Sequence, residues 1–439
     1  MTSGASEAPA AGETTGANAL EDIALPAMLL KQSALENNIA VMAHYAAGHG
    51  FVLAPHGKTT MAPQLFRRQL EAGAWGITVA NMAQAVVAFE AGAPRVLVAN
   101  EIVSRPDARA VVDALAFPAP LPAGPSLPDA IPATASRAAS PLRARSGGGQ
   151  RELYCLVDSV AGVELLDRNL GLAGMADRAR AFVELGVAGG RTGARSEDEA
   201  VAVAGAVGAS THLRLVGVEG YEGLLAPDRS PEALAKVDRY LDRLRRLTLR
   251  LADDGAFSTG GPVLVSAGGS RFFDRVAAVL GEKADYGSHD VRLVVRSGCY
   301  LVHDHGTYAE ASPLAGAGHQ GPGLVGALEV WADVLSVPEP GLVIVGLGRR
   351  DASFDLGLPV TLAVARRGGG VEPLIGMALS ELNDQHGYLH LAGTAAPLGV
   401  GDKVGFGISH PCTAFDKWRT IFLVNDDYEI VERIATFFH

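Results

Sequence analysis

The ten residues Phe51–Thr60, with the sequence FVLAPHGKTT, decide the fold. Their apolar half predicts a buried strand, and the His-Gly-Lys sequence predicts a loop directly after it. On both sides of this stretch, from a strand expected at Ala27–Lys31 onward, further apolar strands alternate with amphipathic helices. Because such alternation builds parallel sheets, the roughly eight βα units up to residue 288 predict a (β/α)₈ TIM-like barrel.

The rest of the chain follows other patterns. Residues 289–439 contain short apolar runs between Gly and Pro turns, which predict a mostly-β C-terminal domain, although 428–438 is expected to be helical. The Ala/Gly/Ser/Thr-rich residues 1–24 predict a disordered tail leading into the β-domain. Within the barrel, expected at 25–288, the Pro/Ala/Ser-rich residues 117–150 predict a mobile insertion.

Composition excludes several classes of protein. The 439 residues include 37 Lys and Arg against 48 Asp and Glu, a formal charge of −11, which argues against nucleic acid or anionic lipid as partner. No apolar run approaches the roughly 18 residues of a membrane span, and the N-terminus lacks the pattern of a signal peptide. Three cysteines cannot form a disulfide framework. We therefore expect a cytoplasmic enzyme or binding protein.

Lys58 is the first candidate for chemistry. It follows a predicted strand, and the carboxyl ends of barrel strands are where active sites of this fold are built. A partly desolvated lysine there is suited to form a Schiff base. The alternative from spacing alone is a solvated loop lysine. The neighbouring His56 either contacts the same ligand or caps the loop.

Two glycine-rich loops follow later predicted strands. Gly268-Gly269-Ser270 precedes a helix, so its backbone and hydroxyl group could bind a phosphate, or it could be an ordinary turn. Arg191, in a Gly-Gly-Arg-Thr-Gly sequence, could contact a phenolate or carboxylate, or could close a capping network. A lysine, a phosphate cradle and an arginine at one rim are together what pyridoxal 5′-phosphate requires.

His410 and Cys412 form a candidate metal pair. Two residues apart on an extended segment, they could point to the same side and bind one ion, leaving positions open for substrate. Imidazole and thiolate favour zinc, with manganese as the alternative. From the residues alone, a buried thiol beside a hydrogen-bonded histidine is favoured, because no further His or Cys sits at metal-ligand spacing.

The motifs together resemble the D-threonine aldolase/D-serine dehydratase group of fold-type III, alanine racemase-like pyridoxal phosphate enzymes. The resemblance implies that Lys58 carries the cofactor and that His410 and Cys412 bind the metal. It also implies cofactor contacts for a set that matches the remaining family motifs: His56, Arg191, Tyr221, Gly268, Gly269, Ser270, Gly298 and Tyr300. Departures include Gln385 in a family Glu-His-Gly tripeptide and the long insertion.

The resemblance implies a homodimeric lyase acting on a small amino acid. The leading hypothesis is dehydration and deamination of D-serine, D-threonine or a related D-3-hydroxy amino acid, with zinc binding the β-hydroxyl group. The alternatives are retro-aldol cleavage to glycine and an aldehyde, amino-acid racemisation, and a non-catalytic pyridoxal phosphate carrier. Nothing in the sequence selects one D-3-hydroxy amino acid.

Overall fold

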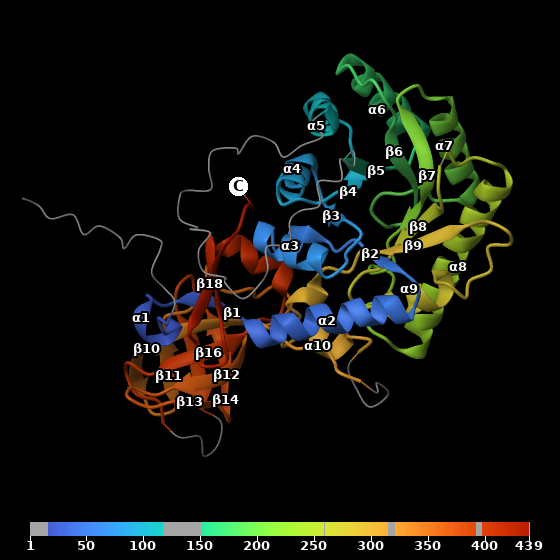
Figure 1. The fold of residues 1–439 in the computed structure, drawn as a ribbon. Coiled ribbons are helices and arrows are strands. Elements are labelled where there is room, and N and C mark those ends of the chain that lie inside the picture. Colours follow the sequence, from blue (N-terminus) through green and yellow to red (C-terminus); the bar gives the residue numbers. More distant parts are fainter. Residues whose placement is uncertain (1–15, 117–150, 259, 315–320, 392–396, 439) are drawn as a thin grey trace, which may run out of the picture.

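The computed structural model describes residues 16–116, 151–258, 260–314, 321–391 and 397–438 (Figure 1). The predicted insertion at 117–150 lies outside these ranges. Figure 1 shows a barrel of parallel strands and covering helices beside a β-rich domain, with the long helix α2 running between them. The predicted combination of a (β/α)₈ barrel and a mostly-β domain is confirmed. No helix in the described part of the chain is long and apolar enough to cross a membrane.

The barrel is one eight-stranded parallel sheet in the order β2-β9-β8-β7-β6-β5-β4-β3. Backbone hydrogen bonds from Trp75 N to Leu53 O (2.7 Å) and from Thr78 N to Pro55 O (2.9 Å) join the two outer strands and close it. Apolar side chains fill its interior. The strands are β2 (Val52–Leu53), β3 (Ile77–Val79), β4 (Arg95–Glu101), β5 (Glu152–Val157), β6 (Ala179–Leu185), β7 (Leu213–Gly220), β8 (Val263–Ala267) and β9 (Val291–Val295).

Eight helices accompany these strands, and each turns an apolar stripe toward the sheet. Several begin at a side-chain cap, such as Ser196, which forms a capping box with Glu199. The helices are α2 (Gln32–Gly48), α3 (Pro63–Glu71), α4 (Met82–Glu90), α5 (Arg105–Ala116), α6 (Val160–Leu172), α7 (Glu197–Ala209), α8 (Pro231–Asp253) and α9 (Phe273–Leu280).

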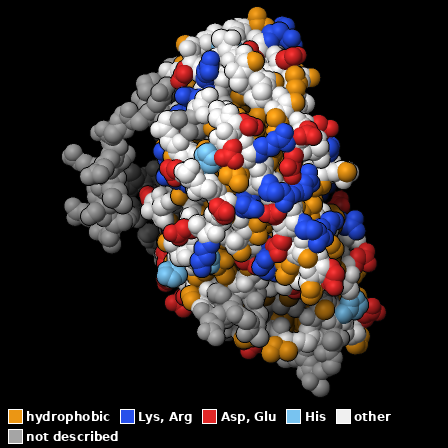
Figure 2. Space-filling model, turned by 90° about the vertical axis from the view of Figure 1, so that its right-hand side faces the viewer, with side chains coloured by type: hydrophobic (Ala, Val, Ile, Leu, Met, Phe, Trp, Pro, Cys, Tyr) orange, Lys and Arg blue, Asp and Glu red, His pale blue; other side chains and the backbone are white. Residues whose placement is uncertain are grey.

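The outer surface of the barrel carries charges of both signs. Figure 2 shows basic and acidic side chains interspersed over this face. Ion pairs join neighbouring helices, including Arg250 to Asp198 at 3.0 Å and Arg275 to Asp238 at 2.6 Å. Because partly exposed pairs each contribute about 0–1 kcal/mol, this face is a solvated exterior rather than a source of large stability.

The β-rich domain is built on a ten-stranded, mostly antiparallel arrangement. Its strands are β1 (Ala27–Lys31), β10 (Leu328–Glu339), β11 (Leu342–Val345), β12 (Val360–Ala365), β13 (Val371–Pro373), β14 (Met377–Leu382), β15 (Gly387–Leu391), β16 (Lys403–Gly407), β17 (Thr420–Val424) and β18 (Ile430–Ala435). Short helices lie at its edges and in the connections: α1 (Ala19–Asp22), α10 (Thr307–Ala311) and the 3₁₀ turns η1 (Gly57–Thr59), η2 (Cys299–Leu301), η3 (Pro411–Thr413) and η4 (Phe415–Lys417).

Two strands, β1 and β9, do not belong to the sheet that the sequence predicts for them. β1 was expected to open the barrel, but it lies between β10 and β17 in the β-rich domain. β9 was expected after the barrel ends at residue 288, but it pairs in parallel with β2 and β8 and completes the barrel. A short apolar run reports only that a strand is buried, so it cannot tell which sheet the strand joins.

Both chain ends also differ from the prediction. Residues 16–24 are not part of a disordered tail, because α1 packs Ala19 and Leu20 into a cluster under Trp331. The expected C-terminal helix is the strand β18, antiparallel to β17. Its buried positions Ile430 and Ile434 are an even number of residues apart, which suits one face of a sheet, and β-branched residues favour strands.

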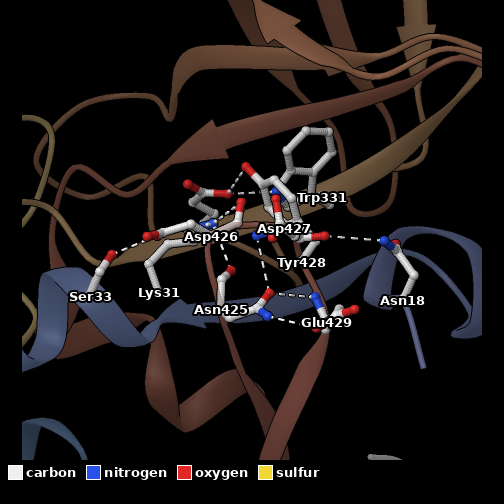
Figure 3. Close-up of polar contacts among 10 residues, drawn as sticks. Asn18, Lys31, Ser33, Trp331, Asn425, Asp426, Asp427, Tyr428 and Glu429 are labelled. Atoms are coloured by element: carbon white, nitrogen blue, oxygen red, sulfur yellow. Dashed lines mark hydrogen bonds and ion pairs between the residues drawn. The ribbon is translucent and has the colours of Figure 1, made fainter. Parts of the chain in front are cut away.

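The N-terminal strand is held to the β17–β18 turn by a polar network (Figure 3). Lys31 Nζ donates to Asn425 O at 3.0 Å and lies 3.9 Å from the centre of the Tyr428 ring. Ser33 Oγ donates to Asp426 Oδ1 at 2.6 Å. The segment that leads into α2 is therefore fixed to the β-rich domain before the barrel begins.

A glycine in β16 is required by the core of the β-rich domain. Trp331 in β10 is fully buried and pairs directly with Gly405, where a Cβ atom would lie 2.6 Å from the indole ring. We expect Gly405→Ala to lower the free energy of unfolding by about 1–3 kcal/mol, because the core must move to admit the methyl group. Urea unfolding measures this change.

The matched control is Gly370→Ala, where the added carbon meets nothing within 4 Å. We expect that variant to stay within about 0.5 kcal/mol of the parent protein. Equal unfolding midpoints for the two variants would contradict the packing argument.

Candidate active site

The segment after β2 places Lys58 at the carboxyl end of the barrel. His56 N donates to Arg296 O at 3.1 Å, which ties this segment to the chain that leaves β9. A Cβ atom on Gly298 would lie 2.4 Å from His56 O, so only glycine allows this approach. The chain then forms the turn η1, from which the Lys58 side chain is exposed. Lys58 therefore lies at the rim of the barrel, as the sequence predicts.

One cavity of about 250 Å³ brings most predicted site residues together. Its walls come from the carboxyl ends of the barrel strands, from α10 and from the η3 turn of the β-rich domain. The predicted residues on these walls are His56, Lys58, Arg191, Tyr221, Gly268, Gly269, Ser270, Gly298 and Cys412. The cavity therefore joins residues that are more than 350 positions apart in the sequence.

Two predicted site residues lie outside the cavity walls. Tyr300 is buried behind them and accepts a hydrogen bond from Gln69 Nε2 at 3.1 Å, and burial raises its pKa to about 12. His410 turns its ring toward Asp355, with Nδ1 2.7 Å from Oδ2. A cofactor contact for Tyr300 is thus not supported by the geometry, whereas His410 lies two residues from a cavity residue.

The cavity has its own balance of charges. The Glu219 carboxyl group and the Arg296 guanidinium group are buried and in contact, and Arg296 Nη2 also donates to Gly220 O at 2.9 Å. Burial raises the pKa of Glu219 to about 8, and Arg296 opposes that shift. Burial, with the nearby charges of Lys58 and Arg296, lowers the pKa of His56 well below its ordinary value. The His56 imidazole is therefore neutral at pH 7.

An arginine and a tyrosine stack on one wall. The guanidinium carbon of Arg191 lies 4.8 Å from the centre of the Tyr221 ring. Such a pair is attractive because the face of an aromatic ring carries partial negative charge. Burial raises the pKa of Tyr221, so its hydroxyl group remains protonated and able to donate.

The predicted phosphate loop is fixed by a carboxylate that sequence reasoning missed. Glu222 is fully buried and accepts hydrogen bonds from Gly268 N (3.1 Å) and Gly269 N (2.6 Å). Ser297 Oγ donates to the carbonyl oxygens of the same two glycines. The glycine N–H groups are therefore committed to Glu222, and an anion at this wall would meet Ser270 instead. Glu222 directly follows Tyr221 in the tyrosine-glycine element, and this adjacency is the sequence signal that could have identified it.

The cavity fits a phosphate-bearing aldehyde cofactor. The Lys58 amine has no hydrogen bond or ion pair within the described ranges. A Cβ atom on Gly269 would lie 3.0 Å from the Tyr221 ring, so glycine keeps this wall open beside Ser270. A free amine, a serine hydroxyl group and an arginine thus face a polar space large enough for a small ligand.

Two thiols meet on the cavity wall, and one of them, Cys299, lies beside Ser270 of the glycine loop. Cys412 Sγ lies 3.3 Å from Cys299 Sγ and 3.4 Å from Thr59 Oγ1. The hydrogen bond between them lowers the pKa of Cys299 and raises that of Cys412. Cys299 was left without a role by the sequence, since nothing local to it indicates this contact.

The metal pair is supported by its donor atoms. His410 Nδ1 donates a hydrogen bond to Asp355 Oδ2, which leaves Nε2 for a ligand, the usual arrangement of a metal-binding histidine. Thr413 Oγ1 donates to the other oxygen of Asp355 at 2.7 Å. In the described part of the chain, no group of three or more His, Cys, Asp or Glu is placed to hold a metal.

Comparisons with known proteins find one family model and a curated relative of similar length. A family model described as "Putative serine dehydratase domain" matches residues 327–424. D-threonine aldolase from Arthrobacter sp. is 23% identical over 408 residues, covering 91% of this chain and 89% of that protein.

Solved structures are similar over nearly the whole chain. D-threonine aldolase from Filomicrobium marinum has a TM-score of 0.74 and 22% identity, over 97% of this chain and 98% of that one. D-threo-3-hydroxyaspartate dehydratase from Delftia sp. HT23 has a TM-score of 0.67 and 22% identity, over 97% and 99%. These comparisons confirm the fold and the resemblance drawn from the motifs.

The bond between Glu222 and the glycine loop can be tested directly. We expect Glu222→Gln to weaken pyridoxal phosphate binding and to cost about 1–3 kcal/mol of stability, because an amide nitrogen cannot accept the second buried N–H. Absorbance titration and urea unfolding measure the two effects. The control is Glu232→Gln, on the exposed first turn of α8. If both variants behaved as the parent does, Glu222 would have no part in fixing the loop.

Proposed function

We propose that this protein is a pyridoxal 5′-phosphate-dependent lyase that deaminates D-serine, D-threonine or a related D-3-hydroxy amino acid. The products are a 2-oxo acid and ammonia, formed by elimination of the β-hydroxyl group. The proposal rests on one observation, that Lys58 from the barrel and Cys412 from the β-rich domain face the same cavity. An amine suited to carbonyl chemistry and a thiol suited to a metal thus meet around one substrate-sized space.

The cavity residues would hold the cofactor by complementary charge and shape. Lys58 provides the amine, Ser270 a hydroxyl group for the phosphate, and Arg191 on Tyr221 a cationic wall. When bound, pyridoxal phosphate supplies an electron sink for charge that develops at the α-carbon of the substrate.

Two nitrogen bases of the chain are available for proton transfer. The Lys58 amine is the group that takes the proton from the α-carbon, since it is exposed in the cavity and carries no other bond within the described ranges. The neutral His56 imidazole lies two residues away. Because it carries no charge, it does not repel the protonated amine of Lys58.

The candidate metal pair would act on the β-hydroxyl group, which is the group that leaves the substrate. His410, oriented by Asp355, and Cys412 would hold a divalent ion for which imidazole and thiolate favour zinc, manganese being the alternative. An ion held by these two residues would supply Lewis-acid chemistry at the β-hydroxyl group of the substrate. The second thiol, Cys299, lies beside this position.

A second candidate function is retro-aldol cleavage of D-threonine to glycine and acetaldehyde. The similarity to two D-threonine aldolases over more than nine-tenths of the chain favours it. That reaction needs the same amine and the same cavity, but a proton leaves the hydroxyl group rather than the α-carbon. The similarity to D-threo-3-hydroxyaspartate dehydratase and to a serine dehydratase model supports the elimination instead.

Removal of the Lys58 amine tests the cofactor assignment. We expect Lys58→Ala to lose the visible absorbance of bound pyridoxal phosphate that borohydride abolishes in the parent, and to lose about 10²–10⁴-fold in turnover with the proton-transferring group. Lys236→Ala, on the exposed face of α8, is the control and should behave as the parent does. A parent-like absorbance in Lys58→Ala would sink the assignment.

Product analysis separates the two reactions. With D-threonine, pyridoxal phosphate and zinc, we expect equal amounts of 2-oxobutanoate and ammonia, and D-serine should give pyruvate. Glycine with acetaldehyde would establish the aldolase instead. A chelator should abolish turnover and added zinc should restore it, because the proposed role of the ion is to polarise the β-hydroxyl group. Full turnover in the chelator would remove the Lewis-acid role.

A further inference from the structure

The three cysteines of this chain have unlike surroundings. Cys299 and Cys412, which are 113 positions apart, come together with 3.3 Å between their sulfurs. Cys155 lies in strand β5, where its sulfur donates to a backbone carbonyl oxygen 3.7 Å away. Cys299 and Cys412 are therefore a thiol pair, and Cys155 is not part of it.

The pair stands where the two domains meet. Cys299 begins η2, shortly after the last strand of the barrel, and Cys412 lies in η3 of the β-rich domain. Thr59 Oγ1, from the turn that bears Lys58, contacts both sulfurs, at 3.8 and 3.4 Å. One hydroxyl group and two thiols thus close a corner of the active-site cavity.

The distance between the sulfurs suits a covalent bond. A disulfide requires about 2.05 Å, so the two sulfur atoms need to approach by roughly 1.3 Å. Both cysteines lie in single 3₁₀ turns rather than within a long helix or a strand, and both side chains line the cavity. A small oxidant that enters the cavity reaches both sulfurs.

We propose that Cys299 and Cys412 form a modification site, a reversible disulfide that joins the barrel to the β-rich domain across the active site. The oxidant is a peroxide. It oxidises one thiol to a sulfenic acid and releases water, and the neighbouring thiol then displaces a second water as the sulfur–sulfur bond forms. In total two thiols and one hydrogen peroxide give one disulfide and two waters, and an added dithiol restores both thiols.

The disulfide has a direct chemical consequence for the site. Once bonded to Cys299, the Cys412 sulfur is no longer a thiolate and cannot bind a metal ion as one. The bond itself depends only on the two sulfurs, so its formation is independent of the proposed lyase activity. Peptide mapping of the full-length protein therefore tests this inference separately from any assay of turnover.

The experiment treats the full chain, loaded with pyridoxal phosphate in a buffer that contains a chelator, with a small excess of hydrogen peroxide. After alkylation under denaturing conditions and tryptic digestion, we expect a peptide pair linked through Cys299 and Cys412. Cleavage after Arg296 and Lys403 separates each from Cys155. Titration should find one free thiol where the untreated protein has three, and dithiothreitol should restore all three.

Two variants make the result decisive. Cys155→Ser should form the linked pair at the parental rate, whereas Cys299→Ser should form none and should accumulate higher oxides at Cys412. Independent oxidation of Cys299 and Cys412 without a linked peptide would overturn the proposal. So would a linked peptide that contains Cys155. Far-ultraviolet circular dichroism before treatment confirms that each variant is folded.

Discussion

The contact between the segment after β2 and the segment after β9 is the constraint on which the site depends. It is a backbone contact, in which His56 N donates to Arg296 O and Gly298 passes against the His56 carbonyl group. Through it, the turn that carries Lys58 and the turn that carries Cys299 share one short wall of the barrel. Any side chain at Gly298 would push these two turns apart. The position of the Lys58 amine therefore depends on glycine at position 298.

The other half of the site arrives through the β-rich domain. Cys412 and His410 follow β16, whose register against β10 is fixed by pairs such as Trp331 with Gly405. β1 joins the same sheet and leads through Lys31 into α2, the first barrel helix. The chain thus crosses between the domains at both ends of the barrel. The sulfur and the amine are held relative to each other by two sheets, rather than by one flexible loop.

The sequence predicts what depends on local order along the chain. Lys58, Arg191 and Ser270 each follow a strand, and in a parallel barrel the carboxyl ends of strands meet at one rim, so their convergence follows from alternation alone. The sheet to which a strand belongs depends on distant partners, and for that reason β1 and β9 were misplaced. The same limit hid the contact of Cys299 with Cys412 and turned Tyr300 from a predicted contact into a buried neighbour of Gln69.

The glycine loop at Gly268 and Gly269 lies where the sequence predicts, but its N–H groups bind Glu222 rather than a ligand. Glycines before a helix suggest free N–H groups for an anion, yet a buried carboxylate already accepts both. Since that carboxylate needs these donors to offset its desolvation, the loop and Glu222 stabilise each other without any ligand. The loop is therefore held in one shape before a cofactor binds. An anion at Ser270 then gains affinity from a preformed wall, because no ordering of the loop opposes its binding.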